Sequence, residues 1–185
     1  MTDITSDSVA ASRGARSNVG VAAQNGASRS PQDTASRDEL VACAELLFFA
    51  YRDFTAGADA VLEEYGFGRA HHRVLHFVQR NPGLRVADLL DILKITKQSL
   101  GRVLKQLLDL GFIEQRPGVE DRRQRLLYPT DAGRALAARL LDPQVKRIGR
   151  ALAALSGAKL AGAEEFLRLI VDAGERDKVA RLIKR

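Results

Sequence analysis

The stretch of the chain between Ile92 and Leu108 combines basic side chains with polar ones that can pair with nucleic-acid bases. It contains no acidic residue. Its basic and polar members are Lys94, Thr96, Lys97, Gln98, Ser99, Arg102 and Lys105. Gln can form two hydrogen bonds with adenine and Arg two with guanine, while Ser and Thr can bind base edges or phosphates. The stretch therefore carries the chemistry of a DNA contact.

Helical spacing divides this stretch into two faces. If it is helical, Gln98, Ser99 and Arg102 lie opposite a row of leucine and valine side chains. That row consists of Leu100, Val103, Leu104 and Leu107. We expect the apolar face to pack and the polar face to read bases. The alternative is that the basic residues only solvate an amphipathic helix.

A second basic group surrounds a turn with the sequence Pro117-Gly118-Val119-Glu120-Asp121. Its arginines are Arg116, Arg122, Arg123 and Arg125. Arginine at a hairpin tip can enter the narrow minor groove of DNA, where the negative potential is strongest. Because a carboxylate near phosphates needs a cation, we expect Asp121 to orient Arg123 or a neighbouring arginine through a charge-assisted hydrogen bond. An exposed charged turn with weak ion pairs is the alternative.

Apolar periodicity and turn residues predict the elements that position these side chains. Helices are predicted over residues 37–64, 69–79, 86–93 and 96–110, and Gly111 ends the last of them as a left-handed cap. Residues 112–128 predict a hairpin, the only segment where the pattern indicates sheet.

Two further helices complete the predicted chain. One begins at the cap Thr130 and extends to about residue 155, and Pro143 bends or restarts it with Asp142 as a candidate cap. The last covers residues 160–183. Two short helices followed by a basic hairpin is the order of a winged helix-turn-helix. The predicted fold class is therefore mainly α, with a small two- to three-stranded β wing.

Composition limits the function classes. The 185 residues carry a net charge of +6 and a pI near 9.8, which suits a polyanionic partner without identifying one. Cys43 is the only cysteine, so an intrachain disulfide and a cysteine-based zinc finger are excluded. No apolar run approaches the ~20 residues of a membrane span, and we expect a cytoplasmic protein without membrane partners. Residues 1–36 are mainly small and polar, which predicts a disordered tail.

Enzyme chemistry is not expected. The sequence has no phosphate-binding glycine loop, no nucleophile motif and no paired-carboxylate site. His72 and His76 are spaced i, i+4 and could share a metal, but no third ligand is fixed by spacing, so we expect no metal site and no cofactor. Cys43 has no flanking cation to lower its pKa, which favours a buried structural cysteine over a redox sensor.

Four motifs occur in a characteristic order. They are Ile95-Thr96-Lys97-Gln98-Ser99-Leu100-Gly101-Arg102-Val103-Leu104-Lys105-Gln106-Leu107, Gly111-Phe112-Ile113, Asp121-Arg122-Arg123 and Thr130-Asp131-Ala132-Gly133. Together they resemble the MarR family of bacterial transcription regulators, and within it the PetP-type branch, over roughly residues 38–183. Pro129 departs from the family pattern, which commonly has Leu before Thr130.

The resemblance implies a homodimer that binds double-stranded DNA at a pseudo-palindromic promoter site. It assigns residues 37–66 to an N-terminal dimerisation helix, 67–130 to the winged helix-turn-helix domain and 131–185 to C-terminal dimerisation helices. The residues implied to approach the major groove are Thr96, Lys97, Gln98, Ser99 and Arg102. Asp121 and Arg123 support insertion of the wing into the minor groove, and Lys105, Arg116, Arg122 and Arg125 complete the predicted DNA-binding set.

The resemblance also implies a small effector, often aromatic or anionic, in a cleft between the dimer helices and the winged lobe. Candidate effector-binding residues are Tyr51, Phe54, Phe67, His71 and Arg73, although a core role explains the aromatic ones equally well. The competing interpretation of the whole chain is a winged-helix protein-interaction module or a non-specific nucleic-acid binder that uses the same basic face.

Overall fold

The structure of the chain, a computed structural model, describes residues 35–155 and 157–183. The predicted disordered tail, residues 1–36, lies outside the described residues except for its last two positions. Within the described ranges the chain forms helices α1 (Arg37–Glu63), α2 (Arg69–Arg80), α3 (Val86–Leu93), α4 (Lys97–Asp109), α5 (Asp131–Ala153), α6 (Gly157–Ile170) and α7 (Arg176–Ile183). Three short strands, β1 (Leu84–Arg85), β2 (Ile113–Pro117) and β3 (Arg125–Pro129), form one antiparallel sheet in the order β1-β3-β2.

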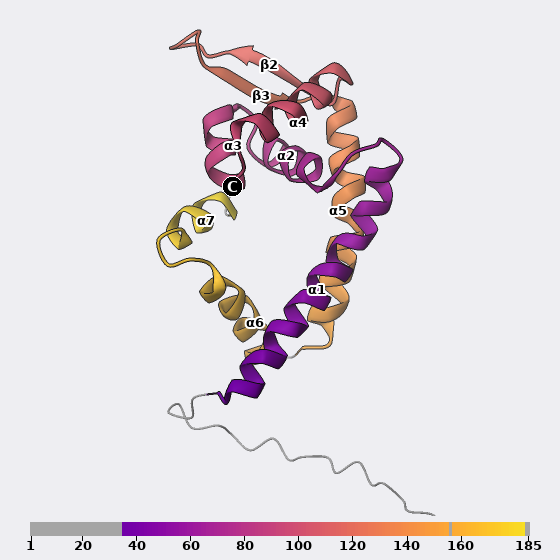
Figure 1. Cartoon of the computed structure of the whole chain (residues 1–185), viewed down its shortest axis with the longest axis vertical. Helices are drawn as coiled ribbons and strands as arrows, with labels where there is room; N and C mark the ends of the chain where they lie inside the picture. The colour runs from indigo at the N-terminus through magenta and orange to yellow at the C-terminus, as the bar shows by residue number, and fades with distance from the viewer. Residues whose placement is uncertain (1–34, 156, 184–185) are drawn as a thin grey trace, which may run out of the picture.

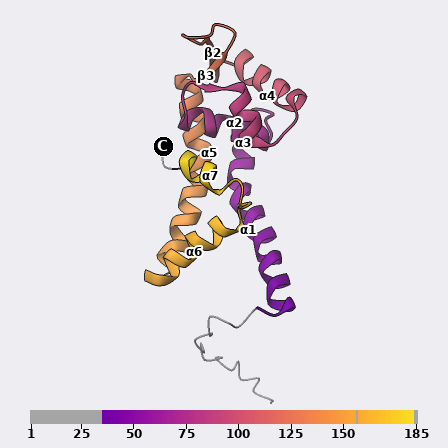
Figure 2. The same cartoon turned by 90° about the vertical axis from the view of Figure 1, so that its left-hand side faces the viewer.

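The winged lobe occupies one end of the molecule. Figures 1 and 2 show α2, α3, α4 and the sheet together, with α1 and α5 running lengthwise away from them. Helix α6 lies at the far end of the long helices, and α7 returns towards α3. No helix among the described residues is long and apolar enough to span a membrane. This arrangement confirms the predicted mainly α winged helix-turn-helix fold.

The hydrophobic core lies inside the winged lobe and extends along the junction with α1 and α5. Its largest fully buried side chains are Leu62, Val74, Leu75, Val78, Leu89, Leu100, Leu107, Ile113, Leu127, Leu136 and Leu140. They come from α1, α2, α3, α4, β2, β3 and α5, so one core fixes the sheet against the helix-turn-helix. Burial of such side chains contributes about 1.5–3 kcal/mol each.

The joint between the wing and α5 depends on Thr130 and Gly133. The Thr130 hydroxyl donates to the carbonyl oxygen of Gly111 at 2.6 Å, and it also accepts from the N–H of Gly133 at 3.0 Å as the cap of α5. A Cβ atom at Gly133 would lie 1.9 Å from the carbonyl oxygen of Phe112. Only glycine allows α5 to start this close to β2.

Three features of the fold differ from the sequence-based expectation. The sheet extends beyond the hairpin, because Leu84 and Arg85 pair with Leu127 and Leu126 of β3. Helix α5 continues through Pro143, so the restart at this proline, one of the two predicted outcomes, does not occur. The ring of Pro143 packs against α1, where a Cβ at Gly57 would lie 2.7 Å from the Cβ of Pro143.

The third difference is at the C-terminal end, where the predicted single helix over 160–183 is two helices. Asp172 accepts the N–H of Gly174 through Oδ1 at 3.0 Å, and its carbonyl accepts the N–H of Glu175 at 2.9 Å. These bonds form a local turn that competes with the helical hydrogen bonds. The chain therefore changes direction between α6 and α7.

Candidate nucleic-acid interface

Helix α4 presents the predicted contact residues to solvent and begins at a well-formed cap. The Thr96 hydroxyl accepts the N–H of Ser99 at 3.1 Å and contacts the Ser99 hydroxyl at 3.0 Å. Lys97, Gln98, Ser99, Arg102 and Lys105 are exposed, whereas Leu100, Val103, Leu104 and Leu107 are buried. The two-faced helix predicted from the sequence is thus present, and Thr96 acts in it as the cap.

The basic side chains of α4 differ in their internal partners. Lys105 pairs with Asp109 at 2.5 Å, four residues further along the helix. Lys97 and Arg102 have no carboxylate partner within the described part of the chain. Their charges are therefore available for a polyanion, while that of Lys105 is partly neutralised in the free protein.

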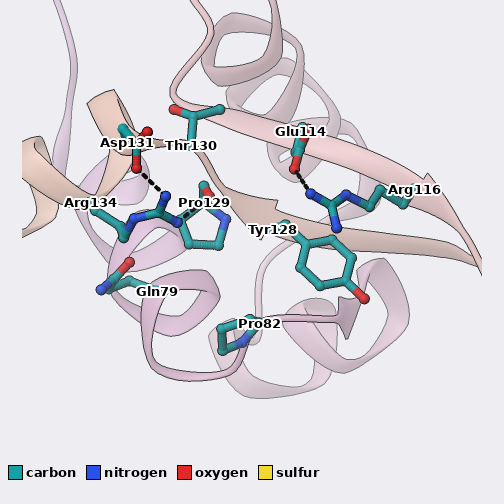
Figure 3. A pocket seen from close by; sticks show the side chains of 9 residues that line it. All are labelled: Gln79, Pro82, Glu114, Arg116, Tyr128, Pro129, Thr130, Asp131 and Arg134. Carbon is teal, nitrogen blue, oxygen red and sulfur yellow. Dashed lines mark hydrogen bonds and ion pairs between the residues drawn. The ribbon is translucent and has the colours of Figure 1, made fainter.

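Arg116 lies on the opposite face of the sheet from Arg125, and on strand β2 instead of the loop that carries Arg122 and Arg123. Arg116 pairs with Leu126 in the ladder, and the next pair is Pro117 with Arg125. Because successive side chains of a strand point to opposite faces of the sheet, the side chains of Arg116 and Arg125 point to opposite faces. Its guanidinium stacks over the ring of Tyr128, with 4.6 Å from Cζ to the ring centre, and forms an ion pair with Glu114. Figure 3 shows these side chains lining a cavity of about 380 Å³ beside the start of α5. Arg116 is held in place by internal contacts.

The tip of the wing carries three exposed arginines, with Arg122 and Arg123 on the loop that Asp121 braces and Arg125 at the start of β3. Oδ1 of Asp121 accepts the main-chain N–H of Arg123 at 2.9 Å. The expected hydrogen bond of Asp121 is therefore formed with the backbone of Arg123, and not with its guanidinium. Arg122, Arg123 and Arg125 have no carboxylate partner among the residues that the structure describes.

A cavity of about 450 Å³ lies between α1, α2 and α5 and contains three of the five predicted effector-binding residues. Tyr51, Phe54 and Arg73 line it. The other lining residues are Thr55, Asp59, Arg69, His72, His76, Phe77, Leu141 and Gln144.

Phe67 and His71 do not line this cavity. Both are buried, with 7% and 8% of their surfaces exposed, and their rings stack with 4.4 Å between centres. The imidazole of His71 links α2 to α4, since Nε2 is 2.6 Å from Oε1 of Gln106. Phe67 and His71 therefore belong to the core, which was the alternative to effector binding for the aromatic candidates.

Apart from Arg73, sequence reasoning did not assign the charged residues and histidines that line the cavity to an effector site. Arg69 donates to both carboxylate oxygens of Asp59, at 3.0 Å from Nε to Oδ1 and 2.8 Å from Nη2 to Oδ2, and so joins α2 to α1. This contact with Arg69 lowers the pKa of the Asp59 carboxyl. Burial lowers the pKa of both His72 and His76, which favours neutral imidazoles. The i, i+4 spacing of the histidines was visible in the sequence, but the tertiary contact with α1 was not.

The structure also bears on the single cysteine and on metal binding. Cys43 is half-buried on α1 in the free chain, which is less buried than expected. Among the described residues no group of three His, Cys, Asp or Glu side chains is arranged to hold a metal ion.

Comparison with known proteins agrees with the winged helix-turn-helix fold. A model described as MarR family matches residues 65–124, which contain the helix-turn-helix and most of the wing. The HTH-type transcriptional regulator PetP of Rhodobacter capsulatus is 43% identical over 132 residues, which cover 71% of this chain and 80% of that protein.

Solved structures show the same fold. The MarR family transcription regulator SP03579 superposes with a TM-score of 0.62 at 19% identity, over 80% of this chain and 95% of that one. A mutant MarR from E. coli, crystallised in complex with operator DNA, has a TM-score of 0.57 at 18% identity, over 75% of this chain and all (100%) of that one. From the family match and the extensive identity to a curated member, the chain belongs to the MarR family of transcription regulators.

Proposed function

We propose that this regulator binds double-stranded DNA in a sequence-specific manner, with α4 in the major groove and the tip of the wing in the minor groove. The observation that carries the proposal is the set of exposed cations without an internal partner, Lys97, Arg102, Arg122, Arg123 and Arg125. Helix α4 and the β2–β3 hairpin lie at the same end of the molecule in both views (Figures 1 and 2). The E. coli MarR structure provides a precedent, because that protein is bound to operator DNA.

A homodimer is the second part of the proposal. The long helices expose large apolar side chains, which on α1 include Leu40, Leu46, Phe48 and Phe49, on α5 Val145 and Ile148, and on α6 Phe166, Leu167 and Ile170. Phe48 alone is 73% exposed. Soluble monomers rarely expose contiguous apolar patches of more than a few hundred Å². A second copy of the chain would cover these side chains and present two winged lobes to a pseudo-palindromic site.

Small-molecule control is the third part. The cavity between α1, α2 and α5 is lined by aromatic rings, by neutral imidazoles and by the exposed guanidinium of Arg73. Arg73 also donates through Nη2 to the carbonyl oxygen of Leu93 at 3.3 Å, at the end of α3. An aromatic carboxylate fits this combination of apolar walls and cationic edge. A ligand that withdraws Arg73 from Leu93 would change how the helix-turn-helix is held.

Selection of bound sequences from random DNA, followed by affinity measurement, tests the first two parts together. We expect one selected inverted repeat, with half-sites about one helical turn (10–10.5 base pairs) or a multiple apart. The selected duplex should bind at least ~10³-fold more tightly than random duplexes of equal length and salt. Light scattering should give twice the mass of one chain. Equal affinity for all duplexes would support the non-specific binder instead.

A further inference from the structure

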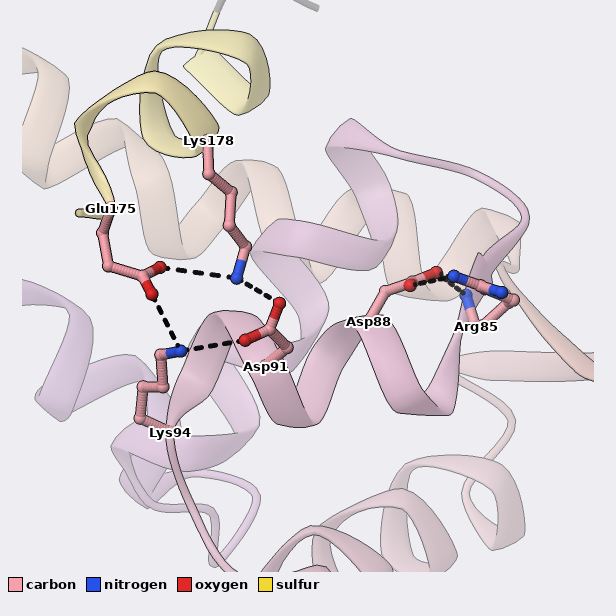
Figure 4. A network of polar contacts seen from close by, with 6 residues as sticks. All are labelled: Arg85, Asp88, Asp91, Lys94, Glu175 and Lys178. Atoms are coloured by element: carbon pink, nitrogen blue, oxygen red, sulfur yellow. Dashed lines mark hydrogen bonds and ion pairs between the residues drawn. The ribbon is translucent and has the colours of Figure 1, made fainter.

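A square of four alternating charges joins the C-terminal segment to the helix-turn-helix. The Nζ atom of Lys94 lies 2.8 Å from Oδ1 of Asp91 and 3.2 Å from Oε1 of Glu175. Lys178 pairs with Asp91, and its Nζ atom is 3.4 Å from Oε2 of Glu175 (Figure 4). Each charge therefore has two partners of opposite sign. Hydrogen bonds from Lys178 and Lys94 lower the pKa of the Asp91 carboxyl to about 2.

Apolar side chains and a hydrogen bond to the backbone also join α7 to the winged lobe. Leu84, Ile92 and Leu182 line a cavity of about 250 Å³ between the helix-turn-helix and α7. The Arg80 guanidinium at the end of α2 donates to the carbonyl oxygen of Ile183 at 3.1 Å. The side chain of Lys178 is only 28% exposed. Helix α7 is thus attached at both of its ends to the winged lobe.

Lys94 has a left-handed backbone conformation at the junction between α3 and α4. It is the only non-glycine residue in the described part of the chain with a positive φ, at 52°. Left-handed backbone is unfavourable for a side chain such as lysine. Lys94 ends α3 and lies two residues before Thr96, the cap of α4. Its left-handed conformation is therefore part of the short turn that joins α3 to the start of α4.

We propose that Glu175 and Lys178 are positioning residues that hold the start of α4 through Lys94 and Asp91. The proposal rests on the proposed function in one respect, namely that α4 contacts DNA. Helix α6 exposes the apolar side chains that a second copy would cover, and the turn at Asp172 connects it directly to α7. A shift of the dimer face would therefore move α7 and, through the charge square, the recognition helix.

Stability is not the main effect of the square. Exposed ion pairs contribute little to the free energy of unfolding, and three of the four side chains here are between 38% and 58% exposed. Breaking these ion pairs should instead make the position of Lys94 less well defined. This difference separates a positioning role from a merely structural one.

The test compares two charge reversals on α7 in the full-length protein. Lys178→Glu disrupts the square, whereas Arg181→Glu makes the same change of net charge at a residue without a carboxylate partner in the described structure. We expect Lys178→Glu to increase hydrogen exchange of the amides of residues 94–99, with an unchanged melting temperature. It should weaken binding of the selected duplex by about 3- to 10-fold more than Arg181→Glu does.

Two results would overturn the proposal. One is unchanged amide exchange at residues 94–99 in Lys178→Glu. The other is an equal loss of DNA affinity in both reversals, which would indicate long-range electrostatics only. Hydrogen exchange needs no DNA, so a change in exchange confined to Lys178→Glu supports the positioning role even if the wild-type protein prefers no duplex.

Discussion

The Nε2 atom of His71 lies 2.6 Å from Oε1 of Gln106, and this contact ties α2 to the recognition helix. Nδ1 of the same ring accepts the N–H of Gly68 at 3.1 Å, at the start of α2. A neutral imidazole with its proton on Nε2 satisfies both bonds, because one nitrogen donates and the other accepts. The ring also stacks on Phe67. His71 therefore connects the cap of α2, the aromatic core and α4.

Replacing His71 should destabilise the winged lobe. His71→Ala removes the stacked ring and leaves Gln106 without its partner, so we expect a loss of about 2–4 kcal/mol in the free energy of unfolding. Urea denaturation followed by circular dichroism measures this. His72→Ala is the matched control, since His72 is the next residue on α2 and is only partly buried. An equal, small effect of both substitutions would contradict the role assigned to His71.

Gly133 and Gly101 should respond to alanine in opposite directions. In Gly133→Ala the new Cβ would overlap the carbonyl oxygen of Phe112, at 1.9 Å, so the joint between the wing and α5 must open. We expect a loss of about 1–3 kcal/mol or more. At Gly101, within α4, a Cβ meets nothing within 4 Å, and alanine should stabilise by about 0.5–1 kcal/mol. Thermal unfolding distinguishes the two, and a tolerated Gly133→Ala would show that the close approach is not required.

Local patterns predicted most of the helices because each has one continuous apolar stripe. The predicted range 86–93 coincides with α3, and the range 96–110 differs from α4 (Lys97–Asp109) only at its ends. Strand β1 was missed because two residues, Leu84 and Arg85, are too few to show alternation, and their pairing with β3 is tertiary. The break between α6 and α7 was missed because apolar residues continue on both sides of the Asp172 turn.

The candidate sites were predicted less completely than the fold, for a physical reason. An aromatic residue that lines a cavity and one that fills a core have the same local pattern, so the sequence did not separate Tyr51 from Phe67. Tyr51 is 56% exposed, whereas Phe67 is 7% exposed. Similarly, four arginines near one turn look equivalent, but the sheet pleat directs Arg116 onto Tyr128. These distinctions depend on contacts between distant parts of the chain.

Substitutions in the recognition helix and the wing should affect DNA binding in different ways. Gln98→Ala should relax base preference at one position of each half-site, by about 1–3 kcal/mol for the preferred base. Arg123→Ala should weaken binding to all duplexes and reduce the salt dependence of the affinity by about one counterion per half-site. Arg116→Ala should have a smaller effect than Arg123→Ala, because Arg116 is already paired with Glu114.

Fluorescence anisotropy with the selected duplex, its single-base variants and random duplexes measures these effects at several salt concentrations. Light scattering of each variant controls for the oligomeric state. If Gln98→Ala and Arg123→Ala weaken every duplex equally, the separation into base reading by α4 and backbone contact by the wing is wrong.

The two histidines of the cavity predict how stability and effector binding depend on pH. Burial lowers the pKa of His72 and of His76 below the ordinary value of 6.5. The charge of His76 lowers the pKa of His72 further, and Asp59 partly opposes this shift. The charge of Arg80 lowers the pKa of His76 further. The unfolded chain therefore binds protons at a higher pH than the folded chain does. As the pH falls below 6.5, the histidines should reduce the free energy of unfolding, whereas above 6.5 they should leave it unchanged. Denaturant titrations across this range, with His72→Gln/His76→Gln as the comparison, should show a shallower decrease in the double variant.

An anionic aromatic ligand should reverse the preference for neutral rings. A carboxylate in the cavity favours imidazolium, so its binding should be accompanied by proton uptake and should become tighter as the pH falls below 6.5. Calorimetry with salicylate in two buffers of different ionisation enthalpy measures the protons taken up. Benzamide, which has a similar ring without the charge, is the control and should bind without proton uptake. Salicylate binding with no linked protons would show that the carboxylate does not lie near the histidines, and would place the ligand elsewhere.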